Sequence, residues 1–255
     1  MAEPLRSQAA AGTAARAADA VVAFLRRIDS PLAGRVRTGR DLAAGLGERG
    51  PGEGAAWSRT LPALAALLPA GLPRGALVEL VGRRGSGRAG FGLALLAAAT
   101  AAGENAVLVD LGDGLDPQGA LAAGVELERL LWARPRRLKE ALAAAEAALA
   151  GGFPLVLVDL GLPPVAGGRG AEAQWLRLAR AAREPKSALV VSTPYRTTGV
   201  AAAAVLALGG PRARWLGRGA EPRLLDGVDA RLDLAHGHGV APAAGRGDGL
   251  RLAAG

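Results

Sequence analysis

Five short apolar runs, most of them rich in Val and Leu, constrain the fold of this chain more than any other feature. Most are separated by Ala-rich stretches with helical spacing. Continuous apolar strands that alternate with helices are typical of a mainly parallel sheet buried on both faces. The predicted strands are Ala76–Val81, Ala106–Leu111, Leu130–Arg134, Leu155–Leu160 and Ala188–Ser192, and the predicted helices are Phe91–Ala102, Pro135–Ala150 and Ala171–Arg183.

The segments outside this alternating region have a different character. Residues 14–28 place apolar side chains at helical spacing, and a Gly/Arg-rich linker follows, so residues 1–56 form an N-terminal unit. Residues 57–209 form the α/β core. Ala203–Gly209, Arg214–Gly217 and Arg223–Leu234 are further predicted strands separated by Gly/Pro turns, so residues 210–239 add partly antiparallel strands at the sheet edge. Residues 240–255 are predicted to be a flexible tail.

Composition and charge narrow the possible partners. The net charge is +8, and residues 169–255 carry 13 basic against 7 acidic side chains. This excess suits DNA, an acidic partner or solubility alone. Of the 31 basic residues 29 are Arg, a bias that makes Arg richness weak evidence for nucleic-acid binding. The absence of Cys excludes disulfides and thiolate metal sites. Without a signal peptide or an apolar run of about 18 residues, we expect a cytoplasmic protein.

A glycine-rich loop follows the first predicted strand. Residues 82–89 (GRRGSGRA) have the spacing of the phosphate loop G-x-x-x-x-G-K-[ST], between a strand and a helix. The backbone amides around Gly82, Gly85 and Gly87 are suited to cradle a phosphate. Both positions with side-chain chemistry differ, because Arg88 replaces the Lys and Ala89 replaces the hydroxyl that ligates magnesium. The loop is therefore predicted to be vestigial.

A carboxylate ends the fourth predicted strand. Residues 155–159 (LVLVD) match the Walker B pattern, in which Asp159 would hold magnesium. The pattern is weak on its own, because Asp commonly caps the end of a buried strand. Residues 107–110 (VLVD) show the same form.

In order and spacing, these motifs resemble the core of the RecA recombinases. The succession comprises residues 72–79 (LPRGALVE), the loop, residues 109–110 (VD), 114–117 (GLDP), 124–131 (GVELERLL) and 132–135 (WARP). Residues 130–135 (LLWARP) are similar to the ImuA family of RecA-like mutagenesis proteins. The resemblance covers roughly residues 60–235 and implies a RecA-like three-layer α/β core.

The resemblance also implies which catalytic groups are missing. RecA proteins place a water-activating Glu two residues after the Asp that matches Asp110, where this chain has Gly112, with Asp113 one residue out of register. They end a later strand in Asn-Gln, where this chain has Thr193 and Pro194. With Arg88 and Ala89, this makes four losses at separate positions. We therefore expect a degenerate ATPase with no catalytic residue, no metal site and no cofactor.

The surfaces that bind DNA or partners are less well defined. RecA-like DNA loops correspond to residues 161–170 and 193–201, in which Arg169 and Arg196 are the candidate phosphate contacts. The helix over 14–28 matches an element that packs on the neighbouring protomer in RecA proteins. If it docks outward, Val21, Phe24 and Leu25 are the candidate anchors, and the alternative is that it packs on its own core.

The similarity to ImuA implies a non-catalytic accessory in SOS-induced translesion synthesis. Its implied partners are RecA, an inactive Y-family-like polymerase subunit (ImuB) and an error-prone replicative-type polymerase, with sequence-independent DNA binding as a further possibility. Three alternatives stay open: a DNA-binding regulator of recombination, a RecA-like cell-division inhibitor, and a slow atypical ATPase.

Overall fold

The structure is a computed structural model, and it describes residues 55–161, 171–217, 223–237 and 249–253. The N-terminal helix predicted over 14–28, and with it Val21, Phe24 and Leu25, lies outside the described residues, as does Arg169. Within the described part, no helix combines the length and apolar character needed to cross a membrane.

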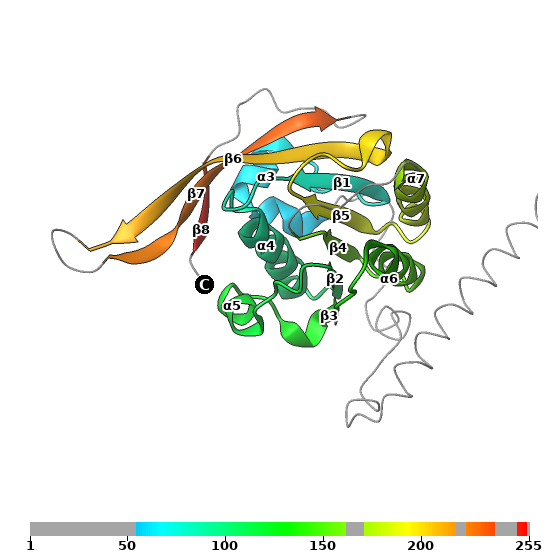
Figure 1. Ribbon diagram of the computed structural model, residues 1–255, viewed down its shortest axis with the longest axis horizontal. Coiled ribbons are helices and arrows are strands. Elements are labelled where there is room, and N and C mark those ends of the chain that lie inside the picture. Colours follow the sequence, from blue (N-terminus) through cyan, green and yellow to red (C-terminus); the bar gives the residue numbers. More distant parts are fainter. Residues whose placement is uncertain (1–54, 162–170, 218–222, 238–248, 254–255) are drawn as a thin grey trace, which may run out of the picture.

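One eight-stranded sheet organises the described residues, in the order β3-β2-β4-β5-β1-β6-β7-β8 (Figure 1). The pairs from β3 to β6 are parallel, and the pairs β6–β7 and β7–β8 are antiparallel. The strands are β1 (Ala76–Val81), β2 (Ala106–Asp110), β3 (Leu130–Ala133), β4 (Leu155–Asp159), β5 (Ala188–Thr193), β6 (Ala202–Leu216), β7 (Leu224–Gly237) and β8 (Gly249–Ala253).

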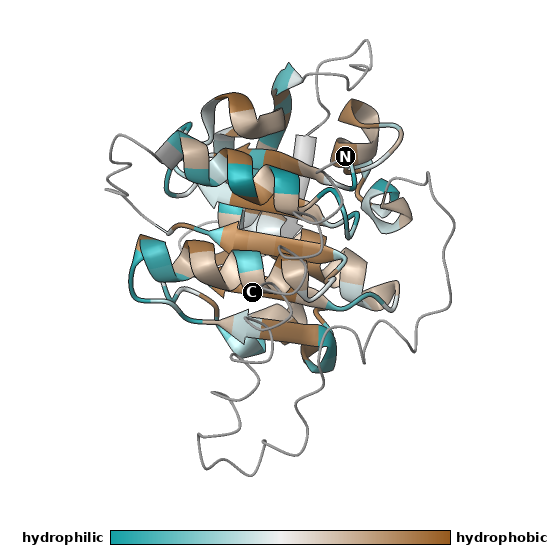
Figure 2. Ribbon diagram, turned by 90° about the vertical axis from the view of Figure 1, so that its right-hand side faces the viewer, coloured by the Kyte–Doolittle hydropathy of each residue, from teal (hydrophilic) through white to brown (hydrophobic). Residues whose placement is uncertain are grey.

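Helices cover both faces of the sheet, which gives the three-layer α/β architecture that the alternation predicts (Figures 1 and 2). The α-helices are α3 (Pro62–Leu67), α4 (Arg88–Ala101), α5 (Pro117–Ala122), α6 (Leu138–Ala150) and α7 (Ala171–Ala181), and the 3-10 turns are η2 (Ala56–Thr60), η3 (Leu127–Arg129) and η4 (Gly199–Ala201). Because β1, β2, β4 and β5 are covered on both sides, their apolar runs are continuous rather than alternating.

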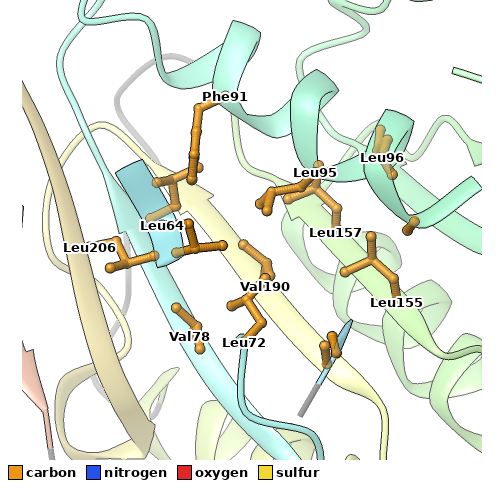
Figure 3. Close-up of a cluster of buried hydrophobic side chains, with 14 of the residues drawn as sticks. Leu64, Leu72, Val78, Phe91, Leu95, Leu96, Leu155, Leu157, Val190 and Leu206 are labelled. Atoms are coloured by element: carbon orange, nitrogen blue, oxygen red, sulfur yellow. The ribbon is translucent and has the colours of Figure 1, made fainter. Parts of the chain in front are cut away.

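Two hydrophobic clusters lie on opposite faces of the sheet. The first joins α3 and α4 to the strands, and Figure 3 shows Phe91, Leu95 and Leu96 of α4 on the helix side of this cluster, with Leu95 beside Leu157. The second joins α6 and α7 to the other face, around the fully buried Trp175. Together the clusters hold the carboxyl ends of the parallel strands at one edge, where a ligand site is expected in such sheets.

The antiparallel region differs from the prediction in two ways. Strand β6 is continuous through Gly209, Gly210 and Pro211, where a turn was expected, and a register shift between Gly209 and Arg212 accommodates the irregularity. The flexible tail predicted over 240–255 needs a correction, because Gly249–Ala253 pairs with β7 as β8. Its backbone hydrogen bonds to a long neighbouring strand stabilise a segment with little pattern of its own.

Candidate functional site

The candidate site lies at the carboxyl ends of β1, β4 and β5, where the predicted phosphate loop leads into α4. The loop turns sharply, with the Ser86 amide donating to the Arg83 carbonyl at 3.0 Å and with Gly85 and Gly87 at φ +77 and +89. A Cβ at Gly82 would lie 2.3 Å from Ser86 Oγ and 3.2 Å from Ser86 Cβ, so a side chain here would force Ser86 to shift. The loop that the sequence predicts is present, between a buried strand and a helix.

The side chain of Arg88 does not lie open to a ligand. It is only 7% exposed, and it reaches from the start of α4 to the ends of β4 and β5. Its Nη1 donates to Asp159 Oδ1 at 2.8 Å and also to Ser192 Oγ, and its Nη2 donates to the Gly161 carbonyl at 2.8 Å. The guanidinium thus ties the phosphate loop to the two strands beside it.

Asp159 is engaged by the same network. Its Oδ1 accepts the Arg88 bond, a bond from the Gly161 amide at 3.0 Å and a longer one from Ser192 Oγ at 3.3 Å. A magnesium ion on this oxygen would lie against a buried guanidinium, and like charges in a partly buried site repel strongly. The hydroxyl ligand is also missing, because residue 89 is Ala. Asp159 therefore serves here as the partner of Arg88.

The position expected for a water-activating Glu is closed by backbone. A Cβ at Gly112 would lie 3.0 Å from Gly161 Cα, and a Cβ at Gly161 would lie 2.9 Å from Gly112 Cα. The Leu111 amide also donates to the Asp159 carbonyl at 2.9 Å. The loops after β2 and β4 thus pack so closely that no side chain fits at residue 112 without a shift.

Asp113, the out-of-register candidate base, is committed elsewhere. Both of its oxygens accept hydrogen bonds from Arg134, at 2.6 and 2.7 Å, and the Arg134 guanidinium lies 4.7 Å from the Trp132 ring centroid. These bonds lower the pKa of Asp113 and raise that of Arg134. A carboxylate with a lowered pKa in an exposed ion pair is a poor general base.

Asp110, at the end of β2, also has a structural role. It accepts hydrogen bonds from the Gly114 and Leu115 amides at 3.1 and 2.9 Å and from Trp132 Nε1 at 3.2 Å. The carboxylate therefore fixes the course of the following loop and joins it to β3.

The end of β5, where RecA proteins carry a phosphate-sensing pair, is also tied to the protein. Thr193 Oγ1 donates to the Tyr195 carbonyl at 2.9 Å. The buried Glu79 of β1 accepts bonds from the Thr197 and Thr198 amides. The loop after β5 is thus anchored to the sheet, while Arg196, the DNA-contact candidate on it, is exposed.

The structure brings together some predicted site residues and adds others. Gly82, Gly85 and Gly87 lie on the loop that leads into Arg88, and Arg88 contacts Asp159. Sequence reasoning missed Ser192, Gly161 and Glu79. Ser192 follows an apolar run in the same way that Asp159 does, which is a signal that could have placed it at the same sheet edge.

Comparison with known proteins agrees with this geometry. Residues 55–166 match the family model of the RecA N-terminal domain. The crystal structure of the RadB recombinase superposes with a TM-score of 0.51 and 18% identity, over 74% of this chain and 91% of that chain. The fold is RecA-like. This confirms the fold class expected from the order of strands, helices and motifs.

Sequence similarity to RecA itself is confined to part of this RecA-like chain. The chain is 38% identical over 90 residues to the RecA protein of Clostridium acetobutylicum, and it is 37% identical over 90 residues to the RecA protein of Rubrobacter xylanophilus. Each match covers 35% of this chain and 26% of the relative. The chain thus matches about a quarter of the length of these curated relatives.

Proposed function

We propose that this chain is a non-catalytic RecA-like accessory protein that acts in SOS-induced translesion synthesis by binding partner proteins. The observation that carries the proposal is the contact between Arg88 and Asp159. It places the residue that replaces the P-loop Lys on the carboxylate that would hold magnesium. Because Arg88 and Asp159 neutralise each other, the loop and the strands beside it do not require a bound nucleotide for stability.

Three further features support the loss of catalysis. Gly112 packs against Gly161, Asp113 is paired with Arg134, and Thr193 bonds within its own loop. In each case a residue that would have to contact water or nucleotide during catalysis contacts the protein itself. A slow ATPase that relies on Arg88 and Asp113 would have to break two ion pairs before each turnover.

The resemblance to ImuA supplies the proposed partners, which are RecA, an inactive Y-family-like polymerase subunit (ImuB) and an error-prone replicative-type polymerase. Strand β3 lies within the segment that carries this resemblance. It is the edge strand at one end of the sheet, and its Leu131 is 45% exposed. Such an edge is accessible to another protein.

Binding to purified RecA and to the two polymerase subunits, measured with ATP, with ADP and without nucleotide, tests the proposal. We expect micromolar or tighter binding to at least one of them, with affinities that agree within about twofold across the three conditions. Nucleotide-dependent binding that Asp159→Ala abolishes would instead support a working nucleotide switch. Failure to bind any of the three at micromolar concentration would refute the proposed function and leave the fold unaffected.

A further inference from the structure

The end of the β6–β7 hairpin carries an unusual concentration of exposed apolar side chains. We call Trp215, Leu216, Leu224 and Leu225 the hairpin end; they are 54%, 55%, 70% and 45% exposed. They make up half of the eight large hydrophobic side chains that are exposed in the described residues. Single exposed apolar residues are ordinary, but a cluster of them on a projection marks an interaction site.

Both faces of the hairpin end are apolar. In the antiparallel ladder Trp215 lies opposite Leu225, and Leu216 lies opposite Leu224. Residues opposite each other share a face and successive residues alternate between faces, so each face carries one of these pairs. A hairpin that packed on its own core would be apolar on one side only. A hairpin that is apolar on both sides fits a groove that surrounds it.

The hairpin is also held in shape before any partner binds. Figure 1 shows β6 and β7 extending together away from the body of the sheet. Arg214 links the two strands through ion pairs with Asp226 at 3.1 Å and Asp229 at 3.7 Å. A preorganised hairpin loses less conformational freedom on docking, so more of its contact energy contributes to affinity.

The charges beside the hairpin end indicate the charge of the partner surface around a groove that would hold it. Arg212 and Arg223 are exposed, and within the part of the chain that the structure describes neither forms an ion pair. Arginines that flank an apolar contact favour an acidic rim on the other side, which speeds association and selects the partner.

We propose that the hairpin end inserts into an apolar groove with an acidic rim on a partner protein. This rests on the proposed function in assuming that the chain acts through protein partners. A second copy fits less well, because two hairpin ends would bring their arginines together.

Two double variants test the two faces separately, with RecA and the two polymerase subunits as probes. Trp215→Ser with Leu225→Ser removes one face, and Leu216→Ser with Leu224→Ser removes the other. The matched control is Leu121→Ser on α5, where the leucine is 60% exposed. We expect each double variant to weaken binding at least tenfold and the control to leave it unchanged. Replacing Arg212 and Arg223 by Glu should slow association and reduce its salt dependence.

A single label gives an independent readout, because the chain has no Cys. Leu225→Cys, coupled to an environment-sensitive fluorophore, should shift to the blue when the protein probe binds, and Leu121→Cys should not. Wild-type binding with unchanged double variants would overturn the hairpin assignment alone. A blue shift obtained with anionic phospholipid vesicles, or by raising the concentration of the chain itself, would overturn it in favour of a membrane or a second copy. If the wild type binds none of the three probes, the proposed function fails first and the inference fails with it.

Discussion

The buried guanidinium of Arg88 donates a 2.8 Å hydrogen bond to the carboxylate of Asp159, 71 residues further along the chain. Arg88 stands where a phosphate loop carries its Lys, and Asp159 stands where a Walker B strand carries its magnesium ligand. In a nucleotide site both side chains would face the ligand. Here they face each other, and the guanidinium also donates a hydrogen bond to the Gly161 carbonyl.

Arg88→Ala should lower the free energy of unfolding by about 1–3 kcal/mol, because it removes the charged donor from Asp159 and the hydrogen bond to the Gly161 carbonyl. The upper range for a fully buried pair does not apply, since the Asp159 side chain is 25% exposed. Urea unfolding followed by circular dichroism measures the change. Arg84→Ala, at an exposed loop position, is the matched control and should change the unfolding free energy by less than about 0.5 kcal/mol. Equal effects of the two variants would mean that the Arg88 network contributes nothing.

Gly112→Glu, which introduces the carboxylate that RecA proteins carry at this position, should destabilise the protein by about 1–3 kcal/mol and should not produce ATP turnover. Its Cβ would meet the Gly161 backbone at 3.0 Å, whereas Gly114 has open space around it. Gly114→Glu is therefore the control for adding the same side chain two residues away. Thermal unfolding of the two variants compares them directly, and a Gly112→Glu protein as stable as Gly114→Glu would contradict the close packing.

Asp113→Asn should reduce stability at pH 7 and lose this effect as the pH falls through the lowered folded pKa of Asp113. The pKa of Asp113 is lowered in the folded protein by its bonds to Arg134, so its contribution is present above the unfolded pKa of about 4 and is lost as the pH falls through the folded pKa. Asn tolerates the left-handed backbone at this position, where φ is +50. Melting temperatures of both proteins across pH 2–8 test this. A difference that persists unchanged at pH 2 would assign the effect to packing.

DNA binding, if measured, should be electrostatic and indifferent to sequence, because the basic excess lies in residues 169–255 and exposed aromatic side chains are few. Affinity for a single-stranded oligonucleotide should then fall steeply between about 50 and 200 mM salt. Arg196→Ala should weaken it modestly for every sequence tested. Tight binding that survives high salt, or that prefers one sequence, would indicate a readout surface on the protein.

Much of the fold follows from the sequence because the core strands are buried on both faces. Runs such as Ala76–Val81 and Leu155–Leu160 are apolar apart from Glu79 and Asp159, and the structure forms β1 and β4 there with at most one residue of difference. The hairpin was harder to predict. Gly209, Gly210 and Pro211 favour a turn locally, yet strand pairing with β7 carries β6 past them.

The sequence predicted the loop residues and Asp159 of the candidate site, but it did not predict the contacts that these residues make. The replacement of Lys by Arg88 is visible in the sequence, but the reach of its side chain to Gly161 and Ser192 depends on which strands are neighbours in the sheet. The close approach of Gly112 to Gly161 joins two loops 49 residues apart, as the sequence numbering shows, and no local pattern encodes it.

The central claim is that the Arg88–Asp159 contact has replaced a magnesium-nucleotide site, and steady-state ATP turnover with magnesium and single-stranded DNA tests it most directly. Each missing catalytic group typically lowers a rate by about 10²-fold or more, so the purified protein should show no turnover above roughly one per minute. Turnover above that rate, abolished by Asp159→Ala, would contradict the account.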